Sequence, residues 1–148
     1  MTQSNGWTGT RAGMPQPGAR VQRSRTVSMR DIERFTEISG DRNPLHYDQA
    51  AAEASRFGGL IVQGGVTSGL LNAAVAEDLP GPGTVFLSVE WVFTQAVYVG
   101  DTITATVEVL TVREDKPICT LATVITNQHG QVCLQGKAST YTTPLIGG

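Results

Sequence analysis

Cysteine is scarce in this sequence, with Cys119 and Cys133 as the only two among 148 residues. Both lie in segments typical of neighbouring strands of a hairpin that turns near residues 127–130. The antiparallel register through that turn places Cys133 opposite Val124 and Cys119 opposite Ala138, so a structural disulfide is not expected. We interpret the cysteines as small apolar strand residues in a reducing compartment.

Patterns that bind metals or nucleotide cofactors are also missing. The chain has two histidines, no C-x-x-C pair and no His/Cys cluster, which excludes the usual zinc arrangements. It contains neither a Walker-type phosphate loop nor a G-x-G-x-x-G sequence. We therefore expect no metal and no cofactor.

Long apolar runs and concentrations of basic residues are lacking as well. Gly, Thr and Ser interrupt every apolar stretch before it could span a bilayer, and no charged start followed by an apolar stretch indicates secretion. The net charge is −2, and no basic-aromatic pattern suggests nucleic-acid binding. We expect a cytoplasmic protein with neither a membrane nor a nucleic-acid partner.

The N-terminal segment differs in composition from the rest of the chain. Its first 25 residues carry four arginines and no acid, together with many glycines and prolines that prevent an amphipathic helix. Residues 1–18 are therefore predicted to be a flexible, solvated tail. Residues 19–148 have a length that suits one folded domain.

Helical patterns occupy the first half of that domain. Ser28 and Asp31 form a capping pattern before an apolar stripe that ends at Gly40, and Asp48 can start a second short helix that ends near residues 57–59. Residues 60–78 then predict a helix that is apolar on almost every face, as expected for a helix buried against a sheet.

Strand patterns fill the second half. Residues 84–97, 102–109, 117–126 and 131–142 have strand-like composition, and the alternation is clearest in 102–109; a further strand is expected near residues 20–27. The fold class predicted is α+β, with one antiparallel sheet of about five strands wrapped around a central helix.

An acid and an imidazole stand five residues apart in the sequence Asp41-Arg42-Asn43-Pro44-Leu45-His46. Pro44 predicts an irregular loop there, and such a pair can transfer protons near neutral pH. The spacing also arises by chance, and this composition is ordinary in turns, so the pattern alone leaves a catalytic and a structural interpretation open. The other histidine, His129, falls in the predicted hairpin turn and is interpreted as solvated.

Three elements together carry a family resemblance: Asp41 to His46, the stretch FGGLIVQGG at residues 57–65, and the turn YVGD at residues 98–101. In this order and spacing the chain resembles the MaoC-like (R)-specific enoyl-CoA hydratases over roughly residues 20–143. The resemblance implies a single hot-dog fold. It also implies the hydration of a trans-2-enoyl thioester to an (R)-3-hydroxyacyl thioester, or the reverse dehydration.

The resemblance also implies roles for individual residues. Asp41 is the expected base and His46 its partner in orienting water and moving a proton, although which of them performs each transfer stays open. Backbone amides of Gly64 and Gly65, at the start of the buried helix, are expected to stabilise the thioester oxygen. The supporting residues are Asn43 and Asn72, and the acyl pocket is assigned to Ile61, Val62, Leu71 and Val75.

The sequence departs from the family pattern at three positions. Gln63 stands where the family commonly has His, Gly65 where it has a larger apolar residue, and Asn72 where short bacterial members have Ser. The small side chains at Gly65 and residues 73–75 predict an acyl pocket that is not tight around the shortest chains.

Two other function classes stay open at this point. A hot-dog acyl thioesterase would share the fold, and a noncatalytic acyl-binding subunit of a heterodimeric dehydratase would lack the Asp/His pair. The expected partner is an acyl-CoA or acyl-carrier-protein thioester substrate. Because a single sheet of this kind leaves an edge uncovered, a homodimer or higher homo-oligomer is also expected.

Overall fold

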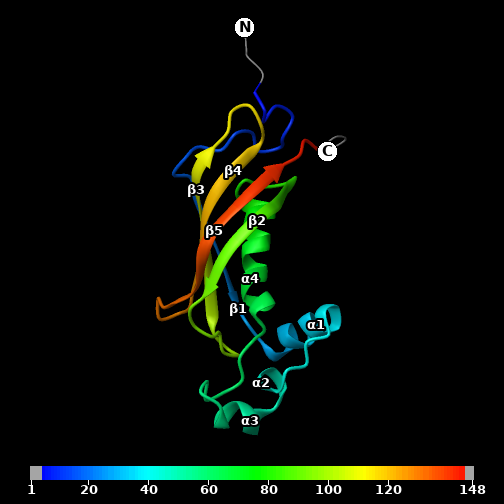
Figure 1. Cartoon of the computed structure of the whole chain (residues 1–148), viewed down its shortest axis with the longest axis vertical. Coiled ribbons are helices and arrows are strands. Elements are labelled where there is room, and N and C mark those ends of the chain that lie inside the picture. Colours follow the sequence, from blue (N-terminus) through cyan, green and yellow to red (C-terminus); the bar gives the residue numbers. More distant parts are fainter. Residues whose placement is uncertain (1–4, 146–148) are drawn as a thin grey trace.

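A computed structural model describes residues 5–145 of the chain. Its centre is one antiparallel sheet with the strand order β1-β3-β4-β5-β2 (Figure 1). The strands are β1 (Arg20–Thr26), β2 (Thr84–Phe93), β3 (Thr102–Val112), β4 (Ile118–Thr126) and β5 (Val132–Thr142). The predicted α+β class and five-stranded sheet are confirmed.

The helices lie between β1 and β2 in the chain. They are α1 (Met29–Ser39), α2 (Pro44–Tyr47), α3 (Gln49–Ala54) and α4 (Gly64–Ala73), and α4 continues into a π-helical turn, η1 (Ala74–Asp78). Figure 1 shows α4 lying along one face of the sheet, while α1, α2 and α3 gather at the end where α4 begins. No helix among residues 5–145 is long and apolar enough to cross a membrane.

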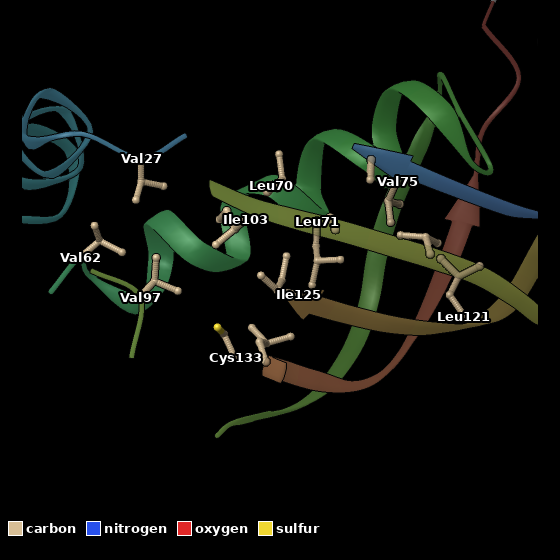
Figure 2. Packing of buried hydrophobic residues seen from close by; sticks show 14 of the residues in the cluster. Val27, Val62, Leu70, Leu71, Val75, Val97, Ile103, Leu121, Ile125 and Cys133 are labelled. Atoms are coloured by element: carbon tan, nitrogen blue, oxygen red, sulfur yellow. The ribbon is translucent and has the colours of Figure 1, made fainter. Parts of the chain in front are cut away.

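The hydrophobic core forms between α4 and the sheet. Alternate residues of β3 point toward the helix because successive strand side chains face opposite sides. Ile103, Ala105, Val107 and Val109 are accordingly buried. The side chains that meet them come from α4, η1, β4 and β5 (Figure 2), and include Leu70, Leu71, Val75, Leu121, Ile125 and Cys133.

The predicted strand over residues 84–97 is shorter than expected. β2 ends at Phe93 and pairs with β5 at the edge of the sheet, while β3 pairs with β1 and β4. The segment after Phe93 approaches the start of α4, where Val62 donates its amide hydrogen to the Val97 carbonyl at 2.9 Å. The expected turn at residues 98–101 is present, with the Asp101 amide bonded to the Tyr98 carbonyl.

The cysteines are free, as predicted, but the strand register is different. Cys119 is paired with Thr140, and Val124 with Gln135, so the hairpin is offset by two positions from the expected pairing. Three hydrogen bonds within the loop, between Asn127 and Gln131, close the turn one residue later than the sequence suggested. Burial raises the pKa of both thiols.

The N-terminal segment contacts the domain, which differs from the solvated tail expected. Trp7 is only 2% exposed and belongs to the hydrophobic core, and its indole N–H donates to the Arg113 carbonyl at 2.7 Å. The Gly18 amide continues the contact by donating to Val109. Glycines and prolines do exclude a helix here, but an extended segment can still be fixed by one large side chain that reaches the core.

Candidate active site

Asp41 follows directly after the end of α1. The capping pattern at the start of that helix forms as predicted, with Asp31 accepting a hydrogen bond from the Ser28 amide at 2.9 Å. Gly40 then ends the helix at a positive φ of 80°, a conformation that glycine adopts without steric cost. The Asp41 carboxylate accepts from the Asn43 amide at 3.0 Å through Oδ1, and Oδ2 lies near the His46 ring.

His46 lies on the one-turn helix α2 and not on the irregular loop that was predicted. Asn43 caps this helix by accepting from the Leu45 amide at 3.1 Å, and Pro44 occupies its first turn. Proline stops a helix that precedes it, but at the first position its missing N–H costs nothing and its fixed φ favours helix. Asn43 therefore has the loop-fixing contact expected of a supporting residue.

The imidazole of His46 is buried and held in one orientation. Its Nδ1 lies 2.7 Å from the Ile61 carbonyl oxygen, which can only accept, so Nδ1 carries the hydrogen. In the neutral ring Nε2 is then an acceptor, and it lies 3.6 Å from Asp41 Oδ2. Two acceptors thus face each other at a separation too long for a direct hydrogen bond.

Gly64 opens α4 beside a cavity of about 580 Å³. The cavity is also lined by Ile61 and Val62, and Ile61 connects it to His46 because the Ile61 carbonyl accepts from the imidazole. Within residues 5–145 the Val66 and Thr67 amides bond to the Gln63 carbonyl, whereas no partner is found for the Gly64 amide. A free N–H at the positive end of a helix is suited to an oxyanion.

Not all of the predicted site residues lie together. Gly65 lines a separate groove beside α1, which also contains Phe35. Leu71 and Val75 are buried in the core between α4 and the sheet, at 0% and 1% exposure, and do not line the cavity beside Gly64. Asn72 is exposed and lies about 12 Å along the helix axis from Gly64, away from the start of α4.

A buried hydrogen-bond network behind the pair was not anticipated from the sequence. Thr36 on α1 donates from its hydroxyl to the Asp41 carbonyl at 2.8 Å and also contacts the Tyr47 hydroxyl. Gln63 donates to the same Thr36 hydroxyl at 3.2 Å. Thr36, Tyr47 and Gln63 form no recognisable sequence motif. The only signal in the sequence was that Gln63 stands where the family commonly has His.

A known protein family matches most of this chain. The family model for the MaoC like domain matches residues 12–130. The chain belongs to the MaoC-like family. Among residues 5–145 of this MaoC-like chain, no cluster of His, Cys, Asp and Glu is suited to hold a metal ion.

Relatives of this MaoC-like protein include proteins named as hydratases and dehydratases. It is 38% identical to the (R)-specific enoyl-CoA hydratase of Aeromonas caviae over 82% of this chain and 90% of that protein. It is 36% identical to the 3-hydroxybutyryl-CoA dehydratase of Methylorubrum extorquens over 76% and 71% of the two chains. The structure of an R-hydratase from Pseudomonas aeruginosa matches with a TM-score of 0.83 and 32% identity, covering 97% of this chain and 90% of that one. The hot-dog fold expected from the sequence is thereby confirmed.

Proposed function

We propose that this protein adds water across the double bond of a trans-2-enoyl thioester to give an (R)-3-hydroxyacyl thioester, and catalyses the reverse dehydration. The observation that carries the proposal is the pair of acceptors formed by His46 Nε2 and Asp41 Oδ2, 3.6 Å apart. One water molecule can donate a hydrogen to each at an ordinary length of about 2.8 Å. Its oxygen lone pair then points away from both.

The reaction follows from that water. Its oxygen attacks C3 of the enoyl group, and one of its protons passes to the pair, with Asp41 as the expected base and His46 as the group that orients water and moves the proton. A proton returns from the pair to C2. Because both groups lie on one side of the substrate, oxygen and hydrogen add to the same face.

Negative charge develops on the thioester oxygen between these steps. The amide of Gly64 at the start of α4 is the proposed donor to this oxygen, supported by the helix dipole. Gly64 is exposed to the cavity, and a β-carbon there would stand 3.3 Å from the Phe93 ring. The absence of a side chain therefore leaves room for the thioester. Gly65 is proposed only as a secondary donor.

The substrate carrier is coenzyme A or an acyl carrier protein, in line with the names of the relatives. Ile61 and Val62, which line the cavity beside Gly64, are proposed to contact the acyl chain near the thioester. Leu71 and Val75 pack in the core between α4 and the sheet and are proposed only to support this wall of the cavity. A cytoplasmic location is supported by the two buried, free thiols, which suit a reducing compartment.

The protein is proposed to act as a homodimer. β2 has a neighbour on one side only, and it carries a row of exposed apolar side chains: Val85, Leu87, Val89, Val92 and Phe93. An edge strand with this composition favours pairing with another chain. Antiparallel pairing of two copies of β2 would satisfy twofold symmetry and extend the sheet across the interface.

The function is tested by incubating the protein with crotonyl, hexenoyl and octenoyl thioesters of coenzyme A and of acyl carrier protein. Hydration removes the absorbance of the conjugated enoyl group without releasing free thiol, and chiral chromatography should give the (R) product. Release of thiol would instead indicate a thioesterase. Binding of every substrate without turnover would indicate a noncatalytic acyl-binding subunit.

A further inference from the structure

Gln63 contacts both segments that carry proposed site residues, the start of α4 and helix α1 before Asp41. Its backbone carbonyl accepts from the Val66 and Thr67 amides and so starts α4, immediately before the Gly64 amide. Its side chain is 1% exposed and reaches α1, donating to the Ile32 carbonyl at 3.1 Å and to the Thr36 hydroxyl at 3.2 Å. One residue is therefore bonded both to the helix that presents the oxyanion donor and to the helix that precedes the base.

The directions of the hydrogen bonds in this network are fixed. The Asp41 carbonyl can only accept, so the single hydrogen of the Thr36 hydroxyl goes to it. The two lone pairs of that hydroxyl then accept from Gln63 Nε2 and from the Tyr47 hydroxyl. Thr36 is fully satisfied, and any change at Gln63 leaves one of its lone pairs without a donor.

The other end of the Gln63 amide is unsatisfied. Oε1 is the one buried side-chain nitrogen or oxygen without a hydrogen-bond partner in the described part of the chain. Rotating the amide would not help, because it would set Oε1 against the Ile32 carbonyl and leave two acceptors in contact. An apolar side chain of the same length would remove the orphaned acceptor but would also lose the two hydrogen bonds that Nε2 donates, so the glutamine brings little net stability.

We propose that Gln63 is a positioning residue for hydration, holding the Asp41 segment at a fixed distance from the Gly64 amide through Thr36. The inference rests on the proposed function. A positioning role would explain why a residue with an orphaned buried acceptor occupies the start of α4. Buried polar atoms without hydrogen-bond partners are rare, and exceptions of this kind occur at functional sites. The water at Asp41 and the carbonyl at Gly64 must act on adjacent parts of one substrate, and small misplacements are costly in rate.

The central test replaces Gln63 by methionine, which has a similar length and no amide. We expect kcat to fall about 10- to 100-fold with KM nearly unchanged, because placement of the reacting groups is lost while the cavity is kept. The melting temperature should change little, since the orphaned acceptor is removed together with the two hydrogen bonds that Gln63 donates. Gln22→Met is the matched control, because Gln22 also donates to a threonine hydroxyl, that of Thr106, away from the site. It should leave kcat unchanged.

Two further variants separate positioning from packing. Thr36→Val should reproduce the loss in kcat, and the Gln63→Met/Thr36→Val double variant should be no slower than the slower single variant, as expected for residues acting through one chain of contacts. Gln63→Glu keeps the shape but, when ionised, cannot donate to Ile32 or Thr36. Its activity relative to the unaltered protein should rise as the pH is lowered and the carboxyl gains a hydrogen.

The outcomes also distinguish this proposal from the proposed function. If the unaltered protein hydrates enoyl thioesters and Gln63→Met has the same kcat, or loses kcat only in proportion to a lower melting temperature, the positioning role is wrong. If the unaltered protein hydrates none of them, the proposed function fails. Amide hydrogen exchange then tests whether Gln63 holds the Asp41 segment in place. Gln63→Met should speed amide exchange in residues 40–47 while β3 exchanges as before; unchanged exchange in that segment would overturn the role.

Discussion

The ring of Phe35 occupies the space beside Gly65. A β-carbon built on Gly65 would stand 2.0 Å from Phe35 Cζ, well inside any real carbon–carbon contact. Phe35 on α1 therefore fills the volume that a larger side chain at position 65 would take. The small size of Gly65 consequently adds no room for an acyl chain, contrary to the prediction that Gly65 widens the acyl pocket.

This contact predicts that the effect of Gly65→Ala on the free energy of unfolding changes sign when Phe35 is removed. Gly65→Ala should destabilise the protein by about 1–2 kcal/mol because Phe35 must move. In a Phe35→Ala background the same change should be neutral or stabilising by up to about 1 kcal/mol, since alanine favours helix over glycine. Urea denaturation of the four proteins measures the coupling. Gly69→Ala on the same helix, where a β-carbon meets nothing within 4 Å, is the control and should not destabilise.

Removing either of the two proposed proton-transfer groups should slow hydration. Asp41→Asn and His46→Gln should each lower kcat for enoyl thioester hydration by about 10²- to 10⁴-fold, the usual contribution of a positioned acid or base. Asp48→Asn is the control for Asp41→Asn, because asparagine caps α3 as well as aspartate does. His129→Gln, at an exposed histidine, is the control for His46→Gln. Steady-state kinetics that found Asp41→Asn as active as Asp48→Asn would contradict the assignment.

The sequence allowed the local features to be predicted. Alternation located the strands, Ser28 with Asp31 located the start of α1, and Gly40 its end. The short helix α2 was missed because proline was taken only as a helix terminator, although it is also favoured at the first turn.

Features that depend on contacts between distant segments were not predictable in the same way. Trp7 reaches the loop at Arg113, more than 100 residues away, and nothing near Trp7 indicates that partner. The network at Thr36 assembles from α1, α2 and the start of α4, and each member is ordinary in its own segment. Asp41 and His46 could be paired from the sequence because they are close along the chain, and in the structure Oδ2 and Nε2 lie 3.6 Å apart.

Acid should weaken the protein through Asp31. Burial opposes ionisation of this carboxyl, but hydrogen bonds from Arg25 and Ser28 outweigh it and hold its pKa below the ordinary 3.8. A lowered folded-state pKa contributes stability above the unfolded value and loses it as the pH falls through the folded value. Urea unfolding near neutral pH should show Asp31→Asn less stable by about 1 kcal/mol, a modest figure because Arg25 is half exposed.

The difference between Asp31→Asn and the unaltered protein should shrink when the pH is taken well below 3.8. There the native carboxyl is itself protonated and resembles the amide. A difference that stayed constant at every pH would show that the ionised form is not the source of the stability.

Trp7 should contribute to the stability of the whole domain. Trp7→Ala removes a side chain that is 2% exposed, and we expect a loss of about 3–5 kcal/mol in the free energy of unfolding. Trp7→Phe keeps most of the apolar contact but loses the bond to the Arg113 carbonyl, and should cost about 1 kcal/mol beyond the smaller ring. Arg11→Ala, an exposed position in the same segment, should have no measurable effect. An unchanged urea midpoint for Trp7→Ala would mean that the segment does not pack on the core in solution.

The free edge of β2 predicts how the chain assembles. Leu87 lies at an irregularity in the β2–β5 pairing and is 56% exposed, among the other apolar side chains of this strand. Leu87→Lys would place a charge at the proposed interface between two copies of β2, where it would lose water without gaining a partner. We expect sedimentation velocity to show a dimer for the unaltered protein and a shift toward monomer for the variant.

Ile38→Lys, on α1 and 83% exposed, changes an equally apolar surface residue away from the edge and should remain dimeric. A stable, fully active monomer of the unaltered protein would refute the assembly, whereas a monomeric Ile38→Lys would place the interface on α1 instead of β2.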